Sequence, residues 1–177
     1  MQFTETDVAG CFVVDLQPFA DDRGFFARAW CADEMSAAGG ANHVAQVNMS
    51  RSVYAGTIRG LHWQTQPHGE SKFVRCIAGR VFDVCVDVRP QSLTYLQWAG
   101  VELTPDNRKA FSVPAGCAHG YQALDDNSEV LYLVSSPYAP GVEQGLRWDD
   151  PTFGIQWPLA GVVQVSDKDA AWPDWTR

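Results

Sequence analysis

An alternation of apolar and polar residues constrains the fold of this chain more than any other feature. It is clearest in RVFDVCVDVR, residues 80–89. Because successive side chains of a strand point to opposite faces, Phe82, Val84 and Val86 share one face. The other face combines apolar residues with Asp83 and Asp87. The segment is therefore predicted to be a strand whose second face is mixed, not simply exposed to water.

Short segments of the same kind follow one another along the chain, with turn residues between them. They are residues 11–19, 43–50, 57–64, 72–79, 95–103, 110–114, 118–124 and 129–136. Many short strands at regular intervals are typical of an antiparallel sandwich or barrel, so we predict an all-β fold. Gly79-Arg80 is a candidate tight turn between the strands at 72–79 and 80–89.

Two segments depart from the strand pattern. Residues 31–38, CADEMSAA, have a helical composition and precede Gly39-Gly40, a candidate helix stop. The tail from Pro137 onward is rich in Pro, Gly and Trp, and we expect it to wrap irregularly around the sheet. Since no repeat or linker is visible, residues 1–177 are predicted to form one domain.

Composition narrows the class of function. The formal net charge is −8, which argues against a general binder of nucleic acids or anionic membranes. No window has the roughly 18 apolar residues of a membrane span, and the N-terminus lacks the features of a secretory signal. The five cysteines form no CxxC pair, so we expect free thiols in a reducing compartment and a cytoplasmic protein.

Five polar side chains lie on predicted strands where a plain core would carry aliphatic residues: His62, Lys72, Asp83, His119 and Tyr132. A barrel with a polar interior would collect them in one cavity. There an imidazole can remove a proton, a tyrosine can donate one, and a lysine can stabilise an oxyanion. These groups are the ones needed to invert a carbon next to a ketone without an organic cofactor.

The stretch RGLHWQ, residues 59–64, raises a geometric question. On a flat strand Arg59 and His62 would point to opposite faces, unless the strand twists or bulges at Gly60. A metal site is the competing interpretation of the histidines, since VPAGCAHG (113–120) has the shape of the second cupin metal motif. The place of the first motif holds only His62, whereas metal sites usually need three or four ligands, so we expect no bound metal.

Taken together, these stretches resemble a known family, the dTDP-4-dehydrorhamnose 3,5-epimerases, which act on nucleotide sugars and have a cupin-type jelly roll with a few short helices. The resemblance covers nearly the whole chain, in order. It includes DDRGFF (21–26), QVNMSRS (46–52), IRGLHWQ (58–64), KFVRCIAGRVFDVCVDVR (72–89), VPAGCAHGYQAL (113–124), LYLVSSPYAPGVEQGLRWDDP (131–151), IQWP (155–158) and SDKDA (166–170).

The resemblance implies roles for individual residues. His62 matches the general base, Asp169 its carboxylate partner, and Tyr132 the proton donor on the other side of the sugar. Lys72 matches the residue that stabilises the enolate oxygen, and Tyr138 the ring that stacks on the nucleotide base. The remaining implied substrate contacts are Arg23, Gln46, Val47, Asn48, Arg59, Asp83, His119, Glu143 and Lys168. Asp83 and His119 could equally be a buried, structural hydrogen-bonded pair.

The chain also departs from the family pattern. Arg28 stands where the family usually carries a glutamate, which would invert the hydrogen bonding if this position faces the substrate. The substrate could then carry a different nucleotide, CDP or GDP. If Arg28 points to solvent, the substitution has no bearing on which nucleotide binds. Met49 and Cys117 stand where the family often has a histidine and an aromatic residue, and both could reshape the site.

Three further expectations follow from the resemblance, and two rival functions remain. The resemblance implies a nucleotide-sugar substrate, no cofactor, and a homodimer in which N-terminal strands cross to the partner. The nearest rival is an epimerase that acts at C3 or C5 alone on another nucleotide-linked 4-keto sugar, with CDP or GDP. A more distant rival is a non-catalytic nucleotide-sugar-binding module.

Overall fold

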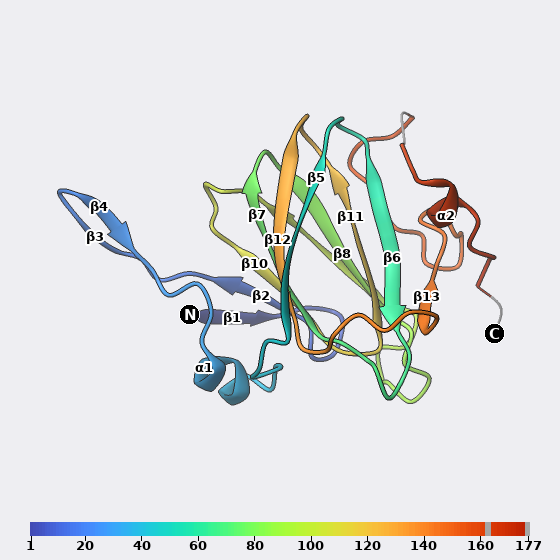
Figure 1. Ribbon diagram of the computed structural model, residues 1–177, viewed down its shortest axis with the longest axis horizontal. Helices are drawn as coiled ribbons and strands as arrows, with labels where there is room; N and C mark the ends of the chain where they lie inside the picture. The colour runs from blue at the N-terminus through green and yellow to red at the C-terminus, as the bar shows by residue number, and fades with distance from the viewer. Residues whose placement is uncertain (162–163, 176–177) are drawn as a thin grey trace.

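A computed structural model describes residues 1–161 and 164–175 of the chain. Two antiparallel sheets pack face to face (Figure 1). The six-stranded sheet has the order β1 (Gln2–Glu5), β2 (Phe12–Asp15), β10 (Ala110–Val113), β7 (Lys72–Ala78), β12 (Ser128–Val134) and β5 (Gln46–Ser52). The five-stranded sheet has the order β13 (Glu143–Gly145), β6 (Ile58–Gln64), β11 (Cys117–Ala123), β8 (Val81–Asp87) and β9 (Trp98–Leu103). The predicted all-β, jelly-roll sandwich is confirmed.

The turn at Gly79-Arg80 does not make a hairpin, so that prediction was wrong. β7 lies in the six-stranded sheet and β8 in the five-stranded sheet, and the turn carries the chain across the sandwich. Gly79 has a φ of 68°, and a Cβ on it would lie 2.5 Å from the Ser128 Oγ atom. Glycine is therefore required at position 79 for the chain to pass from one sheet to the other. The short connection between β7 and β8 suggested that they pair with each other, but each strand pairs with strands from other parts of the chain.

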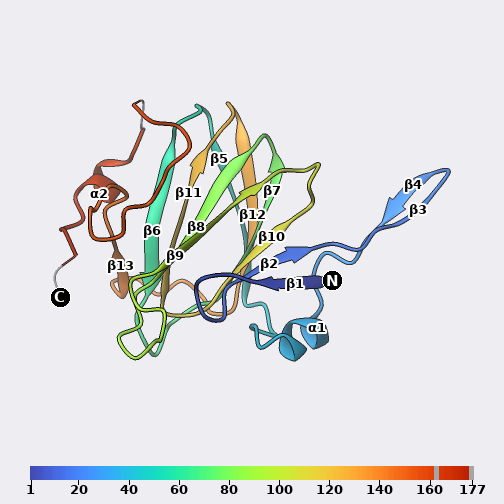
Figure 2. The same ribbon diagram turned by 180° about the vertical axis from the view of Figure 1, so that it is seen from behind.

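The two faces of β8 are buried in two different clusters, which explains its pattern. Val81 and Cys85 point between the sheets, with Val74 and Phe111 of the opposite sheet. The other face packs under the C-terminal tail, in a cluster that contains Val84, Val86, Val88, Leu146 and Phe153. Figure 2 shows the tail running over the outer side of the five-stranded sheet, as the sequence predicted. Because the tail covers it, this sheet has no solvent-exposed face along β8.

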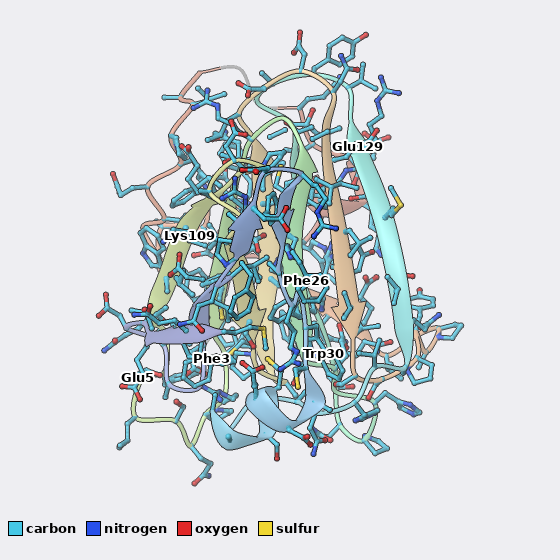
Figure 3. All side chains as sticks on the ribbon, turned by 90° about the vertical axis from the view of Figure 1, so that its left-hand side faces the viewer. Phe3, Glu5, Phe26, Trp30, Lys109 and Glu129 are labelled. Atoms are coloured by element: carbon cyan, nitrogen blue, oxygen red, sulfur yellow. The ribbon has the colours of Figure 1, made fainter. Side chains whose placement is uncertain are left out.

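The N-terminal part holds two smaller elements. Helix α1 (Ala32–Ala37) lies within the predicted segment and is followed by Gly39 with a φ of 81°. The predicted strand at 11–19 is divided, since β2 ends at Asp15 and β3 (Phe19–Asp21) begins after Pro18, which has no backbone donor. β3 pairs only with β4 (Gly24–Phe26), and this β3–β4 hairpin projects from the body (Figure 1). Figure 3 views the molecule from the hairpin's side and labels Phe26 on it.

Helix α2 (Asp167–Ala170) lies on the opposite side of the molecule, beside β6 and β13 (Figure 1). Its N-cap is Ser166, whose side chain accepts a hydrogen bond from the backbone amide of Asp169. No helix within residues 1–161 and 164–175 is long and apolar enough to cross a membrane.

Candidate active site

A cavity of about 730 Å³ opens between the two sheets. Strands β5, β7 and β12 contribute residues from one sheet, and β6, β11 and β13 from the other. Helix α2 contributes a further side of the lining. The predicted site residues that line it are Gln46, Asn48, Arg59, His62, Lys72, His119, Tyr132, Tyr138, Glu143, Lys168 and Asp169. The fold therefore brings together residues that lie up to 123 positions apart, from 46 to 169.

His62 and Asp169 form an imidazole–carboxylate pair in the cavity. The His62 Nε2 and Asp169 Oδ1 atoms are 2.6 Å apart, and the second carboxylate oxygen accepts from the Gly60 amide at 3.2 Å. Burial alone would raise the pKa of Asp169, but its hydrogen bonds to His62, Gly60 and Ser166 hold that pKa below its ordinary value. The ionised Asp169 carboxylate keeps the proton on Nε2, so the lone pair of His62 lies on Nδ1, 3.7 Å from the Glu143 Oε1 atom.

A bulge in β6 resolves the question raised by RGLHWQ. His62 pairs with His119 and Arg59 with Tyr121, so three residue steps on β6 (59 to 62) oppose two on β11 (119 to 121). The extra residue turns the side chains of Arg59 and His62 into the same cavity. Gly60 permits the bulge, because its φ is 113° and a Cβ there would lie 2.6 Å from the His119 carbonyl oxygen.

Tyr132 and Lys72 enter the cavity from the opposite sheet. Burial, together with nearby Tyr121, raises the pKa of Tyr132 above its ordinary value, while Arg59 acts in the other direction. Tyr132 is therefore a protonated phenol at neutral pH, able to donate. The Lys72 ammonium donates to a carboxylate of Glu70.

His119 and Asp83 form a second imidazole–carboxylate pair, with Nε2 and Oδ1 atoms 2.7 Å apart. His119 lines the cavity, whereas Asp83 is fully buried behind it and does not. Burial raises the pKa of Asp83, and His119 and Lys72 only partly oppose this. The arrangement fits the alternative in which Asp83 orients His119 without touching a ligand.

Polar side chains near the cavity mouth hold one another in place. The Tyr138 amide donates to the Gln46 side chain at 2.7 Å, and Lys168 donates to Glu143. Arg59 donates to the Arg51 carbonyl at 2.8 Å and to the Ser52 hydroxyl at 3.2 Å. The mouth therefore combines two cationic side chains, Arg59 and Lys168, with the exposed ring of Tyr138, a set suited to a nucleotide diphosphate.

Comparison with known proteins decides the family. A family model described as dTDP-4-dehydrorhamnose 3,5-epimerase matches residues 5–177. The chain belongs to this family. The dTDP-4-dehydrorhamnose 3,5-epimerase of Methanothermobacter thermautotrophicus is 40% identical over 174 residues, which cover 97% of this chain and 92% of that protein. The resemblance found in the sequence is confirmed, and so is the cupin-type fold.

Solved structures similar to this chain support the same family assignment. The crystal structure of the enzyme of that name from Elizabethkingia anophelis has a TM-score of 0.95 and 32% identity, and the match covers 99% of this chain and 96% of that one. The Legionella pneumophila dTDP-6-deoxy-D-glucose-3,5-epimerase, solved in complex with dTDP-4-keto-L-rhamnose, has a TM-score of 0.88 and 34% identity, covering 99% of both chains. By family, this chain is a carbohydrate epimerase, an isomerase.

Four predicted substrate contacts do not line the cavity of their own chain: Arg23, Arg28, Val47 and Asp83. Arg23 lies at the β3–β4 hairpin and pairs with Asp21. Arg28 pairs with Glu34 of α1 at 2.8 Å. Val47 is 58% exposed, because alternate residues of β5 face away from the cavity.

The two other departures from the epimerase family pattern do not reshape the cavity either. Met49 is 62% exposed on the outward face of β5, and Cys117 is buried in the cluster between the sheets. Neither residue lines the cavity.

Several lining residues were missed by the sequence analysis. They are Ser50, Thr57, Ile58, Gln64, Glu70, Tyr121, Val130, Val134, Ser136, Gln164, Val165 and Ser166. Tyr121 and Ser50 share a hydrogen bond of 2.9 Å, and Gln64 accepts from the Ala139 amide at 2.6 Å and thereby fixes the segment that carries Tyr138. The alternation that placed His119 and Tyr132 also predicts Tyr121 and Gln64, but Glu70 lies between strands and gives no such signal.

Among the described residues, no group of three or more His, Cys, Asp or Glu side chains is arranged to hold a metal ion.

Proposed function

We propose that this protein epimerises a dTDP-linked 4-keto-6-deoxyhexose at C3 and C5. The observation that carries the proposal is the cavity in which the His62–Asp169 pair faces Tyr132 and Lys72 from the opposite sheet. Its volume of about 730 Å³ lies in the range of small-molecule sites. The 4-keto group makes the hydrogens on both neighbouring carbons acidic, so one base can act at C3 and at C5.

His62 is the proposed base. Its Nδ1 lone pair removes the proton from the carbon next to the ketone, and Asp169 stabilises the imidazolium that results. The side chain of Trp172 packs edge-on to the imidazole ring, with ring centroids 6.3 Å apart, and limits its movement.

Tyr132 is the proposed acid. It lies on β12, in the sheet opposite His62, so a sugar between them meets base and acid on different sides. The phenol returns a proton to the face opposite the one from which His62 removed it, and the carbon is inverted. The raised pKa of Tyr132 keeps its proton available at neutral pH.

Lys72 is proposed to stabilise the enolate. Loss of the proton moves negative charge onto the C4 oxygen, and a preformed ammonium lowers the energy of that state. Arg59 and Lys168 are proposed to bind the diphosphate, and Gln46, Asn48, Tyr138 and Glu143 to position the nucleoside and sugar.

Proton NMR in D2O with dTDP-4-keto-6-deoxyglucose tests this function. Enzyme-dependent deuterium at both C3 and C5 is expected, and His62→Ala should abolish it. Deuterium at one carbon would instead establish the single-carbon epimerase. Dissociation constants for dTDP, CDP and GDP test the nucleotide. We expect a preference for dTDP that persists in Arg28→Glu, since Arg28 pairs with Glu34 and does not line the cavity of its own chain.

We further propose a homodimer. The β3–β4 hairpin pairs with no other strand of the described residues, and it exposes Phe19, Phe25 and Phe26. Val47 and Met49 are exposed on β5, an edge strand. Exposed aromatic and aliphatic groups of this kind mark interaction sites. A hairpin laid across the partner's β5 would cover both patches and carry Arg23 to the partner's cavity.

The strands that cross are then β3 and β4. β1 and β2 pair within the six-stranded sheet of their own chain. As part of the same proposal, the five free cysteines support a reducing compartment such as the cytoplasm.

A further inference from the structure

The cavity contains a buried carboxylate, Glu70, that none of the proposed steps uses. It lies between β6 and β7 and is 9% exposed. One carboxylate oxygen accepts a hydrogen bond from the Lys72 ammonium. The other, Oε2, is buried without a hydrogen-bond partner in the part of the chain that the structure describes. Within the described residues, Lys72 is therefore the group that compensates the buried negative charge of Glu70.

Lys72 depends on Glu70 in the same way. Its side chain is 11% exposed, and its one hydrogen bond within residues 1–161 and 164–175 goes to Glu70. Burial favours a neutral amine over an ammonium unless an anion lies beside it. An ammonium has three donors, so the bond to Glu70 leaves two that can reach a ligand.

The backbone around Glu70 is anchored to the end of β12, the strand that carries Tyr132. The Ser136 hydroxyl donates to the Gly69 carbonyl at 3.0 Å, and the Ser71 amide donates to the Ser135 hydroxyl at 2.9 Å. The Ser135 amide donates back to the Ser71 carbonyl at 3.1 Å. Glu70 is thus held at a fixed place relative to the proposed acid.

We propose that Glu70 is a positioning residue that keeps Lys72 charged and aims its two free donors at the C4 oxygen of the sugar. This inference rests on the role proposed above for Lys72. Glu70 acts only through Lys72, and no proton or bond is exchanged with the substrate.

Other charged and titratable groups face Lys72 from the elements packed around it. They are Arg59 and His62 from β6, His119 and Tyr121 from β11, Tyr132 from β12, and Asp83 from β8, behind His119. Asp83 is the other carboxylate near Lys72, but its hydrogen bond goes to His119. Glu70 is therefore the anion in direct contact with the ammonium.

The first test follows the protonation of Lys72 directly. The chain has three lysines, Lys72, Lys109 and Lys168, so ¹³Cε-labelled lysine gives three signals that single Lys→Arg variants assign. In Glu70→Gln the Lys72 signal is expected to titrate at a pH lower by roughly one unit or more. Lys109 and Lys168 should not move, nor should any lysine in the exposed control Glu102→Gln.

An unchanged Lys72 titration in Glu70→Gln would overturn the inference. This measurement requires no turnover, so it is independent of the proposed reaction. Failure of the wild-type protein to exchange deuterium into the substrate would count against the proposed function instead.

The second test uses kinetics. Glu70→Gln is expected to lower kcat about tenfold or more at pH 8, with a KM changed less than about threefold, and to move the alkaline limb of the kcat profile to lower pH. Glu70→Asp keeps the charge and should retain the wild-type limb with a higher kcat than Glu70→Gln. Equal losses in both variants, with an unchanged pH profile, would reduce Glu70 to a structural role and contradict the proposal.

Discussion

At the scale of single residues, the proposed reaction depends on which nitrogen of His62 holds the proton. Asp169 is 5% exposed and bound to Nε2, and the Gly60 amide and Ser166 fix it in place. A carboxylate accepts but does not donate, so the proton stays on Nε2 and the lone pair lies on Nδ1. A substitution that lets residue 169 donate would reverse this assignment.

Asp169→Asn tests the assignment. The amide can donate to Nε2 and place the proton on Nδ1, so kcat is expected to fall about 10²- to 10⁴-fold with little change in fold. The rate of deuterium incorporation measures the loss. Asp167→Asn, an exposed position on the same helix, serves as the control. A variant at position 169 with wild-type exchange would show that the pair is not catalytic.

Asp87 allows a prediction for stability instead of activity. It is fully buried, and its carboxylate accepts from Arg89 at 2.8 Å, Ser92 at 2.5 Å and Thr94 at 2.6 Å. Burial alone would raise its pKa, but these hydrogen bonds lower the pKa of Asp87 well below the ordinary range. A carboxyl group whose pKa is lower in the folded state stabilises the fold above its unfolded pKa.

Asp87→Asn is therefore expected to lower the free energy of unfolding by about 2 kcal/mol at pH 7, since a charged hydrogen-bond acceptor is lost. The difference from wild type should shrink as pH falls below about 3.9, the ordinary value for Asp, toward the lowered folded value. Urea denaturation at a series of pH values measures it. A difference that stays constant down to pH 2 would contradict the assignment of this stability to the Asp87 charge.

At the scale of elements, the bulge in β6 determines whether the site exists. It turns Arg59 and His62 to one side, and Gly120 approaches Gly60 from β11 so closely that a Cβ on Gly60 would lie 2.7 Å from its Cα atom. Regular pairing would place Arg59 on the side away from the cavity.

Gly60→Ala is expected to reduce both stability and activity, because the added Cβ meets backbone atoms and the φ of 113° is strained for alanine. Gly154→Ala provides the comparison, since Gly154 also has a positive φ, 58°, but has open space around its Cβ position. Thermal unfolding and kcat are the measurements. Equal effects of the two substitutions would show that the close approach of β11 is unimportant.

The limits of sequence-based prediction are visible at this scale. The alternation along β8, β11 and β12 predicted which faces carry Asp83, His119 and Tyr132, because side chains of a regular strand alternate strictly. The bulge could only be posed as a question, since it depends on the register of two strands whose paired residues, His62 and His119, lie 57 positions apart. Glu70 was missed, because a loop residue has no period that shows where it points.

At the scale of the whole molecule, a single chain does not explain why the β3–β4 hairpin exposes its aromatic side chains. Phe19 and Phe26 are 76% and 72% exposed, although aromatic rings are normally placed against apolar surroundings. Arg23 lies in the turn between β3 and β4 and does not line the cavity of its own chain. Sequence alone gave no reason to place this arginine apart from the other substrate contacts.

Complementation between two inactive variants tests the shared site. If Arg23 serves the partner's cavity, unfolded and remixed Arg23→Ala and His62→Ala chains should form mixed dimers with one intact cavity each. Random mixing then restores about a quarter of the wild-type kcat per chain. Activity no higher than the mean of the two variants would show that Arg23 does not serve the partner's cavity. Sedimentation of Phe26→Asp, expected to be monomeric, provides the independent check.

In the proposed reaction, one cavity inverts two carbons through a base on one sheet and an acid on the other. Proton NMR in D2O with dTDP-4-keto-6-deoxyglucose tests it most directly, with wild-type protein beside His62→Ala and Tyr132→Phe. We expect deuterium at C3 and C5 with the wild type and none with His62→Ala, whereas Tyr132→Phe should lose inversion. Exchange that persists in His62→Ala at the wild-type rate would contradict it.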